Sequence, residues 1–598
     1  MDIQKILFPE VGRCTETELY FRLGKKTEYR GDKKSITFRK HAVVAFDTYF
    51  NGFSIEKWMK YTVLQELALR LSLSGKFKVT LLGKDQIHND VLTKVISETV
   101  VECDGRGEFE FPYTLGEKKG MYTFRLEALS DGACFYGGTY ITDLAQERVR
   151  DVKLGIAICT FKREAFVEKN IRILNEEILN NPASPLYGRM KVFIADNGKS
   201  LERERLSSEH IYINPNRNLG GAGGFTRDLI EIMKHNGELG ITHALLMDDD
   251  IVIEPEALVK TYRILSLLKD DYADAFVGGA MLRLDKQAIQ VEAGASWNGG
   301  YLNSLKHNLN LKKCKSCLYN EVEEYTEFNA WWYCCFPMKI VTPDNLPLPI
   351  FIRGDDLEYG LRNMKHLILM NGICVWHEPF ENKYSSFLEY YIMRNQLIDN
   401  SFHCQWYGAK QLTKAMLGHC MREIMFYRYK NVDLYLRGIR DFLKGPEWLM
   451  KQDGEALHQS VMAAGYKAQE LEQLDMAFSY PVYQESYEYV DNKKSKIKRL
   501  LTFNGLFLRA KGTNIIPMAA ARPVHFYRKK CVMQYDVTSR KAFITEKSVG
   551  ASLRYMGKVF GLICVLPFRL KKAQQAYRTE GMRLRTLAFW NEFLGLDS

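Results

Sequence analysis

The fold is decided by the stretch His243-Ala244-Leu245-Leu246-Met247-Asp248-Asp249-Asp250-Ile251-Val252-Ile253. Its apolar run predicts a buried strand, and that strand ends in three consecutive carboxylates. Because like charges at one strand end repel one another, we expect a cation beside them. A hard divalent ion takes oxygen ligands and bridges carboxylates to phosphates, which makes Asp248 and Asp250 candidate ligands. The alternative for an isolated Asp-Asp-Asp is a solvated acidic turn.

Strand and helix patterns alternate around this stretch. Apolar strands are expected at 154–161 and 191–195, and the second of them ends at Asp196. A third unit ends in the polar run 214–218, and a glycine-rich segment, 219–225, precedes the next helix. Polar side chains therefore follow one strand after another, at the edge of an open parallel sheet where ligands bind.

Each of these loops allows two interpretations. Arg163 is either a surface charge or a phosphate contact, and Asp196 either caps the next turn or accepts hydrogen bonds from a base or a ribose. Gly220 and Gly221 open a run that lacks both the GxGxxG spacing and the P-loop lysine. These glycines either form a tight turn or let the backbone approach a ligand closely.

A carboxylate pair, Asp355-Asp356, stands where a helix is expected to begin. Such a pair suits proton abstraction, because one charge raises the proton affinity of the other. We predict that Asp356 is a general base with Asp355 beside it. His377 is either a structural imidazole or a third metal ligand with Asp248 and Asp250.

The tryptophans and cysteines are core residues by default. Trp331 and Trp332 belong to the core unless their ring faces stack on a sugar. The 13 cysteines fit reduced, buried thiols, since an odd number cannot all pair within one chain. The Cys-x-x-Cys at 314–317 and the adjacent pair at 334–335 lack the second spacer of a zinc cluster.

Length and composition predict an ordinary globular chain of several domains. The 598 residues suggest roughly three or four domains of about 150 residues each. Short alternating segments in residues 1–150 predict a β-sandwich, and the part after about residue 390 has helical patterns. The chain opens without a signal peptide pattern, and we expect no apolar window of about 18 residues that could span a membrane. A cytosolic or peripheral protein is expected.

The formal charge of +11 indicates an anionic surface or ligand towards the end of the chain. Basic and apolar residues adjoin at 493–501 and again at 555–572. Each segment could lie in an anionic membrane interface, and the alternative is a buried core helix. Aromatic residues are not interleaved with basic ones in a nucleic-acid-binding module, so we do not expect a nucleic acid partner.

The motifs named above occur in a fixed order. They are Thr160-Phe161-Lys162-Arg163, Asp196-Asn197-Gly198, Asn216-Arg217-Asn218-Leu219-Gly220-Gly221-Ala222-Gly223-Gly224-Phe225, Asp248-Asp249-Asp250, Trp331-Trp332-Tyr333, Asp355-Asp356 and Trp376-His377. Their order and spacing over about residues 151–400 resemble the bacterial galactofuranosyltransferases, inverting GT-A glycosyltransferases related to the mycobacterial galactan polymerase. The resemblance implies a multidomain α/β protein. Its parts are a jelly-roll-like N-terminal β-sandwich (1–150), a central GT-A (Rossmann-like) catalytic domain (151–400) and a mostly helical C-terminal domain (401–598).

The resemblance also implies an activity and the residues that carry it. The activity is transfer of galactofuranose from UDP-galactofuranose to a hydroxyl of a cell-surface glycan, commonly lipid-linked. Mn²⁺ or Mg²⁺ is implied as the cofactor, held by Asp248, Asp250 and His377, and Asp356 is implied as the base. The donor residues implied are Arg163, Asp196, Asn216, Arg217, Gly220, Gly221 and Asp249, and the acceptor residues are Trp331 and Trp332. A peripheral place at the cytoplasmic face of the bacterial inner membrane fits these acceptors, and a homo-oligomer is compatible with them.

The chain departs from the family pattern where the sugar is chosen. Gly354 precedes the acidic pair where a bulkier tryptophan is expected, and the segment 303–325 matches no family feature. Rhamnose or another hexose is therefore an alternative donor sugar. A catalytically inactive glycan-binding protein is the alternative of another class, although the intact acidic motifs and His377 disfavour it.

Overall fold

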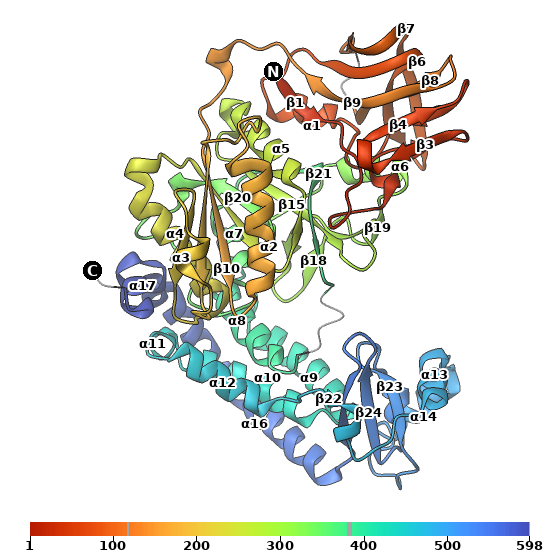
Figure 1. The fold of residues 1–598 in the computed structure, drawn as a ribbon. Helices are drawn as coiled ribbons and strands as arrows, with labels where there is room; N and C mark the ends of the chain where they lie inside the picture. The colour runs from red at the N-terminus through yellow and green to blue at the C-terminus, as the bar shows by residue number, and fades with distance from the viewer. Residues whose placement is uncertain (117–118, 380–384, 597–598) are drawn as a thin grey trace.

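The computed structural model describes residues 1–116, 119–379 and 385–596 and consists of three successive parts (Figure 1). An N-terminal β-rich part lies against a central α/β part, and a long helical part follows. The fold class predicted from the sequence is confirmed: a β-sandwich, a central GT-A-like sheet and a mostly helical C-terminal region.

The N-terminal part is a nine-stranded antiparallel sheet folded around an aromatic core. Its elements are β1 (Asp2–Lys5), β2 (Arg22–Leu23), β3 (Thr27–Arg30), β4 (Ser35–Phe38), β5 (Val43–Ala45), α1 (Ile55–Tyr61), β6 (Ala68–Ile87), β7 (Asp90–Pro112), β8 (Met121–Ala128) and β9 (Ala133–Ile141). The long strand β6 joins the two halves, because its first half pairs with β9 and its second half with β8. Phe46 and Phe124 stack at 4.2 Å in this core.

The central part is a ten-stranded mixed sheet. Its strands are β10 (Leu154–Thr160), β11 (Met190–Asp196), β12 (Ile211–Pro215), β13 (His243–Asp248), β14 (Val252–Ile253), β15 (Phe276–Arg283), β16 (Ile289–Glu292), β19 (Leu309–Asn310), β20 (Cys334–Pro337) and β21 (Leu367–His377). Strands β10 to β13 are parallel, in the spatial order β12-β11-β10-β13. The alternation of strands and helices predicted a parallel sheet. The sheet is mixed instead, because β20 runs antiparallel between β13 and β15.

Helices and one hairpin complete the central part. They are α2 (Glu164–Leu174), α3 (Arg203–Leu206), α4 (Gly220–Leu239), α5 (Pro255–Ser266), the hairpin of β17 (Ala295–Trp297) and β18 (Leu302–Ser304), α6 (Cys314–Glu321) and α7 (Asp355–Asn363). The carboxyl ends of β10, β11, β12 and β13 meet at one edge of the sheet. The polar residues that follow these strands are therefore brought together there.

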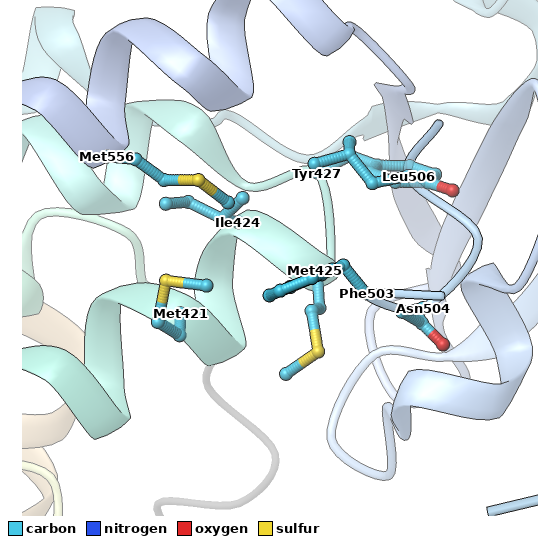
Figure 2. A pocket seen from close by; sticks show the side chains of 8 residues that line it. All are labelled: Met421, Ile424, Met425, Tyr427, Phe503, Asn504, Leu506 and Met556. Carbon is cyan, nitrogen blue, oxygen red and sulfur yellow. The ribbon is translucent and has the colours of Figure 1, made fainter. Parts of the chain in front are cut away.

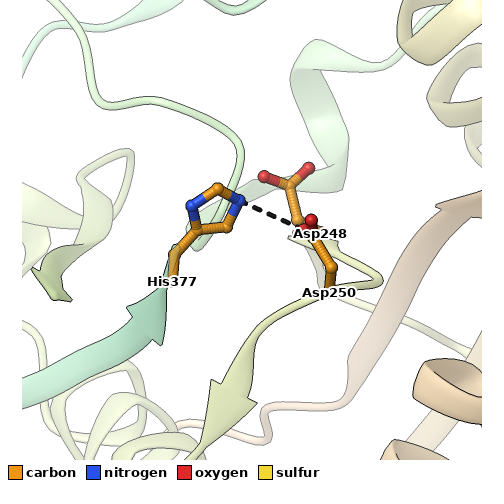
Figure 3. A group of neighbouring side chains, drawn as sticks. All are labelled: Asp248, Asp250 and His377. Carbon is orange, nitrogen blue, oxygen red and sulfur yellow. Dashed lines mark ion pairs between the residues drawn. The ribbon is translucent and has the colours of Figure 1, made fainter. Parts of the chain in front are cut away.

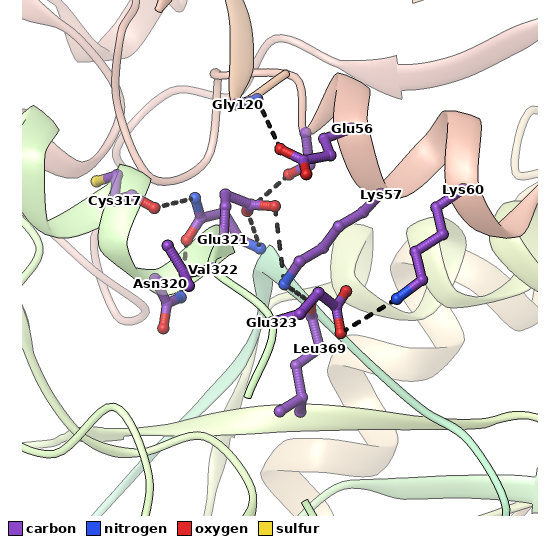
Figure 4. Close-up of polar contacts among 12 residues, drawn as sticks. Glu56, Lys57, Lys60, Gly120, Cys317, Asn320, Glu321, Val322, Glu323 and Leu369 are labelled. Atoms are coloured by element: carbon purple, nitrogen blue, oxygen red, sulfur yellow. Dashed lines mark hydrogen bonds and ion pairs between the residues drawn. The ribbon is translucent and has the colours of Figure 1, made fainter. Parts of the chain in front are cut away.

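A buried polar contact fastens the N-terminal part to the central part (Figure 4). Glu321 of α6 accepts hydrogen bonds from the hydroxyl of Ser54 (2.8 Å) and from the backbone N–H of Asn371 (3.0 Å) through the same oxygen. Lys57 of α1 lies 3.8 Å from the other oxygen and donates to the carbonyl of Leu369. Separating these groups would leave buried charges unpaired, which is costly. The contact therefore fixes the position of the N-terminal part relative to the central part.

The C-terminal part packs as a helical bundle with a small sheet at one end. Its helices are α8 (Leu388–His403), α9 (Ala409–Met425), α10 (Tyr429–Phe442), α11 (Pro446–Met450), α12 (Gly454–Ala464), α13 (Tyr480–Glu488), α14 (Lys493–Leu501), α15 (Pro523–Phe526), α16 (Val549–Thr579) and α17 (Leu587–Leu594). The strands β22 (Gln469–Glu470), β23 (Asn514–Pro517), β24 (Cys531–Asp536) and β25 (Lys541–Glu546) form a sheet that was not predicted.

The segment Val549–Arg585, which contains α16, is long and apolar enough to cross a membrane, judged by length and composition alone. The expectation that no such window exists is therefore wrong. Leu562, Leu566 and Leu570 of α16 are buried in the same core as residues of α8, α9 and α10. Phe560 and Phe568 are exposed, so the helix presents its other face to solvent.

Candidate active site

Asp248, Asp250 and His377 converge at the end of the central sheet (Figure 3). Asp248 ends β13, His377 ends β21, and β14 pairs with β21 so that Val252 lies opposite Trp376. One ligand atom from each of the three residues lies within 4.8 Å of the other two. The structure thus brings together the three residues predicted to hold a metal ion.

The tautomer of His377 favours a cation at its other nitrogen. Nδ1 lies 2.6 Å from the carbonyl oxygen of Glu378, so Nδ1 carries a proton and donates it. Nε2 lies 3.1 Å from a carboxylate oxygen of Asp250. Two acceptors approach that closely only if Nε2 is also protonated or if a cation lies between them. A carbonyl that fixes the tautomer is the usual support of a metal-bound histidine.

The carboxylates carry more negative charge than their surroundings compensate. Burial raises the pKa of Asp248 to about 7, His377 opposes this rise, and the charges of Asp250 and Asp249 add to it. Two carboxylates and one imidazole form a donor set that suits Mn²⁺ or Mg²⁺. The residues present therefore fit a divalent cation.

Arg163 and Asp249 form the other side of the triplet. Arg163, which precedes α2, places Nη1 2.9 Å from Asp249 Oδ1 and 2.9 Å from Asp250 Oδ2. The other oxygen of Asp249 accepts a hydrogen bond from the hydroxyl of Thr160 (2.7 Å), and its backbone carbonyl accepts one from Asn170 (3.0 Å). Asp249 points into the protein and orients Arg163, while its predicted donor contact stays a prediction.

Asp196 and Asn216 lie side by side at the ends of β11 and β12. Both carboxylate oxygens of Asp196 accept backbone N–H groups, from Gly198 (3.0 Å) and Leu201 (2.8 Å), so this residue caps the following turn. Asn216 donates to the side-chain oxygen of Asn197 (2.8 Å), and its own buried Oδ1 has no hydrogen-bond partner among the residues that the structure describes. An unsatisfied buried acceptor is costly, which favours a ligand donor at Asn216.

The glycine-rich loop packs on the loop that leads to the acidic pair. Gly220 has a φ of +72°, and a Cβ there would lie 2.1 Å from the carbonyl oxygen of Phe351. A Cβ at Gly221 would lie 3.6 Å from Asp355 Oδ2. Arg217 pairs with Asp453, the cap of α12, at 2.8 Å. Gly220 is therefore needed for contact within the protein, whereas Gly221 faces the acidic pair.

Asp355 and Asp356 form the first turn of α7, where the helix dipole favours negative charge. Burial and the neighbouring charge of Asp356 raise the pKa of Asp355 to about 8. Burial also raises the pKa of Asp356, although the N–H of Leu357 opposes this rise. Raised proton affinity at a buried pair is what a general base needs near neutral pH.

Gly354 explains one departure from the family pattern. Its φ is +97°, and a Cβ would lie 2.6 Å from Asp399 Oδ2. A tryptophan cannot stand at this position without displacing Asp399 and straining the backbone. The surroundings of the acidic pair consequently differ from those expected for the galactan polymerase.

Trp331 and Trp332 lie in the core. Each is only 5% exposed. Trp331 packs edge-on against Phe225 at 5.3 Å, and the indole N–H of Trp332 donates to the carbonyl of Gly279 at 2.9 Å. The prediction of two open stacking faces is corrected here, because protein atoms already cover both rings.

Sequence reasoning missed the residues that clamp the loop before α7. Phe351 and Arg353 both have positive φ values, 75° and 66°. The amide of Asn395 in α8 donates to the carbonyls of Ile350 (3.0 Å), Ile352 (2.7 Å) and Arg353 (2.7 Å). Asn395 thereby holds a strained loop in place. No local signal distinguished Asn395 from the other amides of this helical run, such as Gln396 and Asn400.

Glu358 was also missed. It is fully buried one turn after the acidic pair and contacts Arg362 (2.8 Å), His403 (3.2 Å) and Arg585 (3.1 Å). Burial raises its pKa, but these three partners outweigh burial and lower it to about 2. Glu358 therefore ties α7 to the C-terminal part.

The cysteines are free thiols, as expected. Among the residues that the structure describes, no group able to hold a metal ion includes the cysteines at 314–317 or 334–335. The zinc-cluster alternative has no support.

Comparisons with known proteins agree with the resemblance. Residues 3–140 match the family model described as galactofuranosyltransferase 2 N-terminal. The chain is 25% identical over 481 residues to galactofuranosyltransferase GlfT2 of Mycolicibacterium smegmatis, covering 74% of this chain and 71% of that protein. It is 26% identical over 460 residues to GlfT2 of Mycobacterium tuberculosis, covering 71% and 69%.

A mannosyltransferase from Pyrobaculum calidifontis, solved with GDP-mannose and Mn²⁺, is a distant structural neighbour. Its TM-score is 0.28 at 10% identity, and the match covers 54% of this chain and 82% of that one. The sequence relatives, not this neighbour, confirm the resemblance to the galactofuranosyltransferases.

Proposed function

We propose that this chain, a glycosyltransferase related to the galactofuranosyltransferases, transfers galactofuranose from UDP-galactofuranose to a hydroxyl of a glycan acceptor, with inversion at the anomeric carbon. The observation that carries the proposal is the convergence of Asp248, Asp250 and His377, whose ligand atoms lie within 4.8 Å. Asp355 is buried and Asp356 is half-buried, and the pair borders the same edge of the sheet, since a Cβ at Gly221 would lie 3.6 Å from Asp355 Oδ2.

In the proposed reaction, different residues act as the base, bind the metal ion and orient the nucleotide. Asp356 accepts the proton of the acceptor hydroxyl while that oxygen attacks the anomeric carbon. The new carbon–oxygen bond forms as the bond to the diphosphate breaks, and UDP leaves from the opposite face. Asp248, Asp250 and His377 would hold Mn²⁺ or Mg²⁺, and a cation bound there would supply positive charge that stabilises a departing diphosphate. In this proposal Asn216 and Arg163 orient the nucleotide; the unpartnered Oδ1 of Asn216 among the described residues and the position of Arg163 beside Asp250 support it.

The proposal is tested by UDP release from the purified protein with Mn²⁺ or with EDTA. The donors are UDP-galactofuranose, UDP-galactopyranose, UDP-glucose and a nucleotide-linked rhamnose, each with the same synthetic lipid-linked glycan acceptor. Metal-dependent release only with UDP-galactofuranose supports the proposal. Binding of UDP and Mn²⁺ without turnover of any donor would contradict it and favour the inactive glycan-binding alternative.

A second donor sugar has one specific observation in its favour. Gly354 and Asp399 occupy the space next to the acidic pair where the family pattern has a tryptophan. A pocket changed at this point could select rhamnose or another hexose by the same mechanism. Turnover of the rhamnose donor in preference to UDP-galactofuranose would identify this alternative.

We also propose that the protein binds peripherally to the cytoplasmic face of a bacterial inner membrane. Four lysines of α14 are exposed, at positions 493, 494, 496 and 498. Leu500 and Leu501 of the same helix are 79% and 76% exposed, and Phe503 and Phe507 follow them on the surface. Basic side chains beside exposed apolar ones fit an anionic lipid surface.

Beneath the exposed residues that follow α14, mainly apolar side chains line a small cavity against the helical bundle (Figure 2). Phe503 and Leu506 border a small cavity of about 30 Å³ together with Met425 of α9 and Met556 of α16. These contacts attach the segment after α14 to the helical bundle. The exposed residues are thus presented by a fixed scaffold and not by a free tail.

A further inference from the structure

Three exposed aromatic rings surround the β17–β18 hairpin. Tyr301 is 73% exposed, Tyr325 is 78% exposed and Trp406 is 55% exposed. Large aromatic rings gathered on a surface mark binding sites more often than single ones do. Each of these three is also held by specific contacts with the hairpin or its neighbours.

The turn of the hairpin is shaped to fit Trp406. The backbone N–H of Asn298 donates to the carbonyl of Tyr301 (3.1 Å), which closes the turn around Gly299 and Gly300. A Cβ at Gly299, whose φ is +60°, would lie 2.6 Å from the indole ring of Trp406. Trp406 therefore rests on bare backbone, while more than half of its surface stays open.

The hairpin itself is fixed by α8 and by Glu327. Asn400 of α8 accepts the indole N–H of Trp297 (2.9 Å) and donates to the carbonyl of Gly299. Glu327 accepts the backbone N–H of Trp297 (2.7 Å) through one oxygen and the hydroxyl of Tyr325 (3.1 Å) through the other. Trp406 and Tyr325 are thus fixed against the hairpin that carries Tyr301.

This unit is packed directly on the helix that carries the proposed base. Ala295 and Trp297 of the hairpin lie in one apolar cluster with Leu357, the residue after Asp356. Asp399, next to Asn400 in α8, lies beneath Gly354 at the start of α7. The hairpin beside the exposed rings is therefore packed on the helix that begins with Asp355 and Asp356.

We propose that Tyr301, Tyr325 and Trp406 form a second glycan-binding site, which holds sugars of the acceptor distant from the reacting hydroxyl. This inference rests on the proposed function, because it assigns the ligand of that same site. Sugar rings offer C–H faces that stack on aromatic rings and hydroxyls that bond to amides. The amides of Asn298 and Asn303, both exposed on the hairpin, supply such partners beside the rings, which suits the hydroxyls of a glycan.

Acceptor length tests the site. The probes are two synthetic galactofuranose acceptors with the same lipid tail, a disaccharide and a hexasaccharide. Trp406→Ala and Tyr301→Ala should each raise KM for the hexasaccharide by roughly three- to tenfold, as expected for one lost stacking contact. KM for the disaccharide, kcat and the KM for the donor should stay within twofold of wild type. Trp406→Phe, which keeps an aromatic ring, should restore most of the affinity.

Controls separate this inference from the proposed function. Tyr187, half exposed elsewhere on the central part, provides the matched variant Tyr187→Ala, which should behave as wild type with both probes. Calorimetric binding of each probe in EDTA, without donor, gives a readout independent of turnover. A wild-type protein that transfers to neither probe refutes the proposed function. A wild type that transfers to both but binds them equally tightly, or a Trp406→Ala variant unchanged with the hexasaccharide, refutes only the second site.

Discussion

The guanidinium of Arg163 lies 2.9 Å from a carboxylate oxygen of Asp250, one of the three proposed metal ligands. Arg163 thus supplies positive charge to the triplet, and a divalent cation bound by Asp250 would compete with it. An arginine released from the carboxylate can then turn towards a phosphate, which guanidinium groups bind well.

Replacing Arg163 should therefore separate metal binding from donor binding. We expect Arg163→Ala to bind Mn²⁺ at least as tightly as wild type without donor, because a competing cation has been removed. The KM for the nucleotide sugar should rise by about tenfold or more, the loss expected for one charge-assisted hydrogen bond. Calorimetry with Mn²⁺ and initial rates across donor concentrations measure the two effects. Weaker Mn²⁺ binding in the variant would show that Arg163 supports the metal site and does not compete with it.

Substitutions of the adjacent residues Asp249 and Asp250 should have very different effects on Mn²⁺ affinity and on transfer. Asp250→Asn removes a proposed ligand and should weaken Mn²⁺ binding by more than tenfold and nearly abolish transfer. Asp249→Asn alters a carboxylate turned towards Thr160 and Arg163, so its Mn²⁺ affinity should stay within severalfold of wild type. Both variants should keep the wild-type circular dichroism spectrum. Equal losses of Mn²⁺ binding would contradict the assignment of ligands.

Asp356→Asn should keep binding of UDP and Mn²⁺ and lose transfer by about 10²- to 10⁴-fold, the usual contribution of a general base. A base works only when ionised, so kcat/KM in the wild type should fall as pH drops through its pKa. Since burial raises the pKa of Asp356, this acid limb should lie above the value of about 3.9 for an ordinary aspartate. A pH–rate profile checks this. An acid limb at or below that value would rule out Asp356, in its buried state, as the base.

Gly220→Ala should destabilise the protein, because its Cβ would meet the carbonyl oxygen of Phe351 and its φ is positive. We expect a loss of about 2–4 kcal/mol in the free energy of unfolding, combining backbone strain with the steric conflict. Gly237→Ala in the same helix is the control, since a Cβ there meets no atom within 4 Å. That change should be neutral or stabilising by up to about 1 kcal/mol. Urea unfolding measures both, and equal behaviour would mean that the two loops do not touch.

The sequence predicted what local pattern can specify. The apolar run before Asp248 marked a strand, and strand ends in an α/β sheet gather at one edge, so Asp248 and Asp250 could be placed there from the pattern, whereas His377 was added to them by the family resemblance. The contact of Gly220 with Phe351 could not be predicted, because the two lie more than a hundred residues apart and neither carries a signal for the other. The default expectation of a core position for Trp331 and Trp332 is the one that the structure bears out, and the acceptor role came from the family resemblance instead.

In the C-terminal part, too, some elements could be predicted from local sequence patterns and others could not. Helical periodicity and basic charge indicated α14 and α16 correctly. The strands β23 to β25 escaped notice, because runs of four to six residues carry little periodicity. Asn395 holds the loop before α7 through hydrogen bonds to three backbone carbonyls. Every residue has such a carbonyl, so the sequence alone does not identify these contacts.

Membrane binding through α14 predicts a dependence on both charge and apolar surface. Wild-type protein should float with vesicles of phosphatidylcholine and phosphatidylglycerol at low salt, and less at high salt, because surface charges are screened. Lys493→Glu with Lys494→Glu should reduce flotation at low salt most, since basic residues near the surface contribute about 1 kcal/mol each. Leu500→Ser with Leu501→Ser should reduce it at every salt concentration.

A control double substitution on another surface distinguishes specific membrane binding through α14 from non-specific binding of exposed apolar residues to vesicles. Leu92→Ser with Val95→Ser changes two half-exposed apolar residues of β7, in the N-terminal part, and should leave flotation unchanged. Transfer to a soluble acceptor should be normal in all three variants, because α14 lies in the C-terminal part and α7 in the central part (Figure 1). If the β7 variant loses flotation as much as the α14 variants, or the wild type fails to float at low salt, membrane docking through α14 is wrong. If flotation depends on α14 as expected, the acceptor is delivered at a lipid surface, and transfer to a vesicle-bound acceptor should fall with flotation while transfer to the soluble one does not.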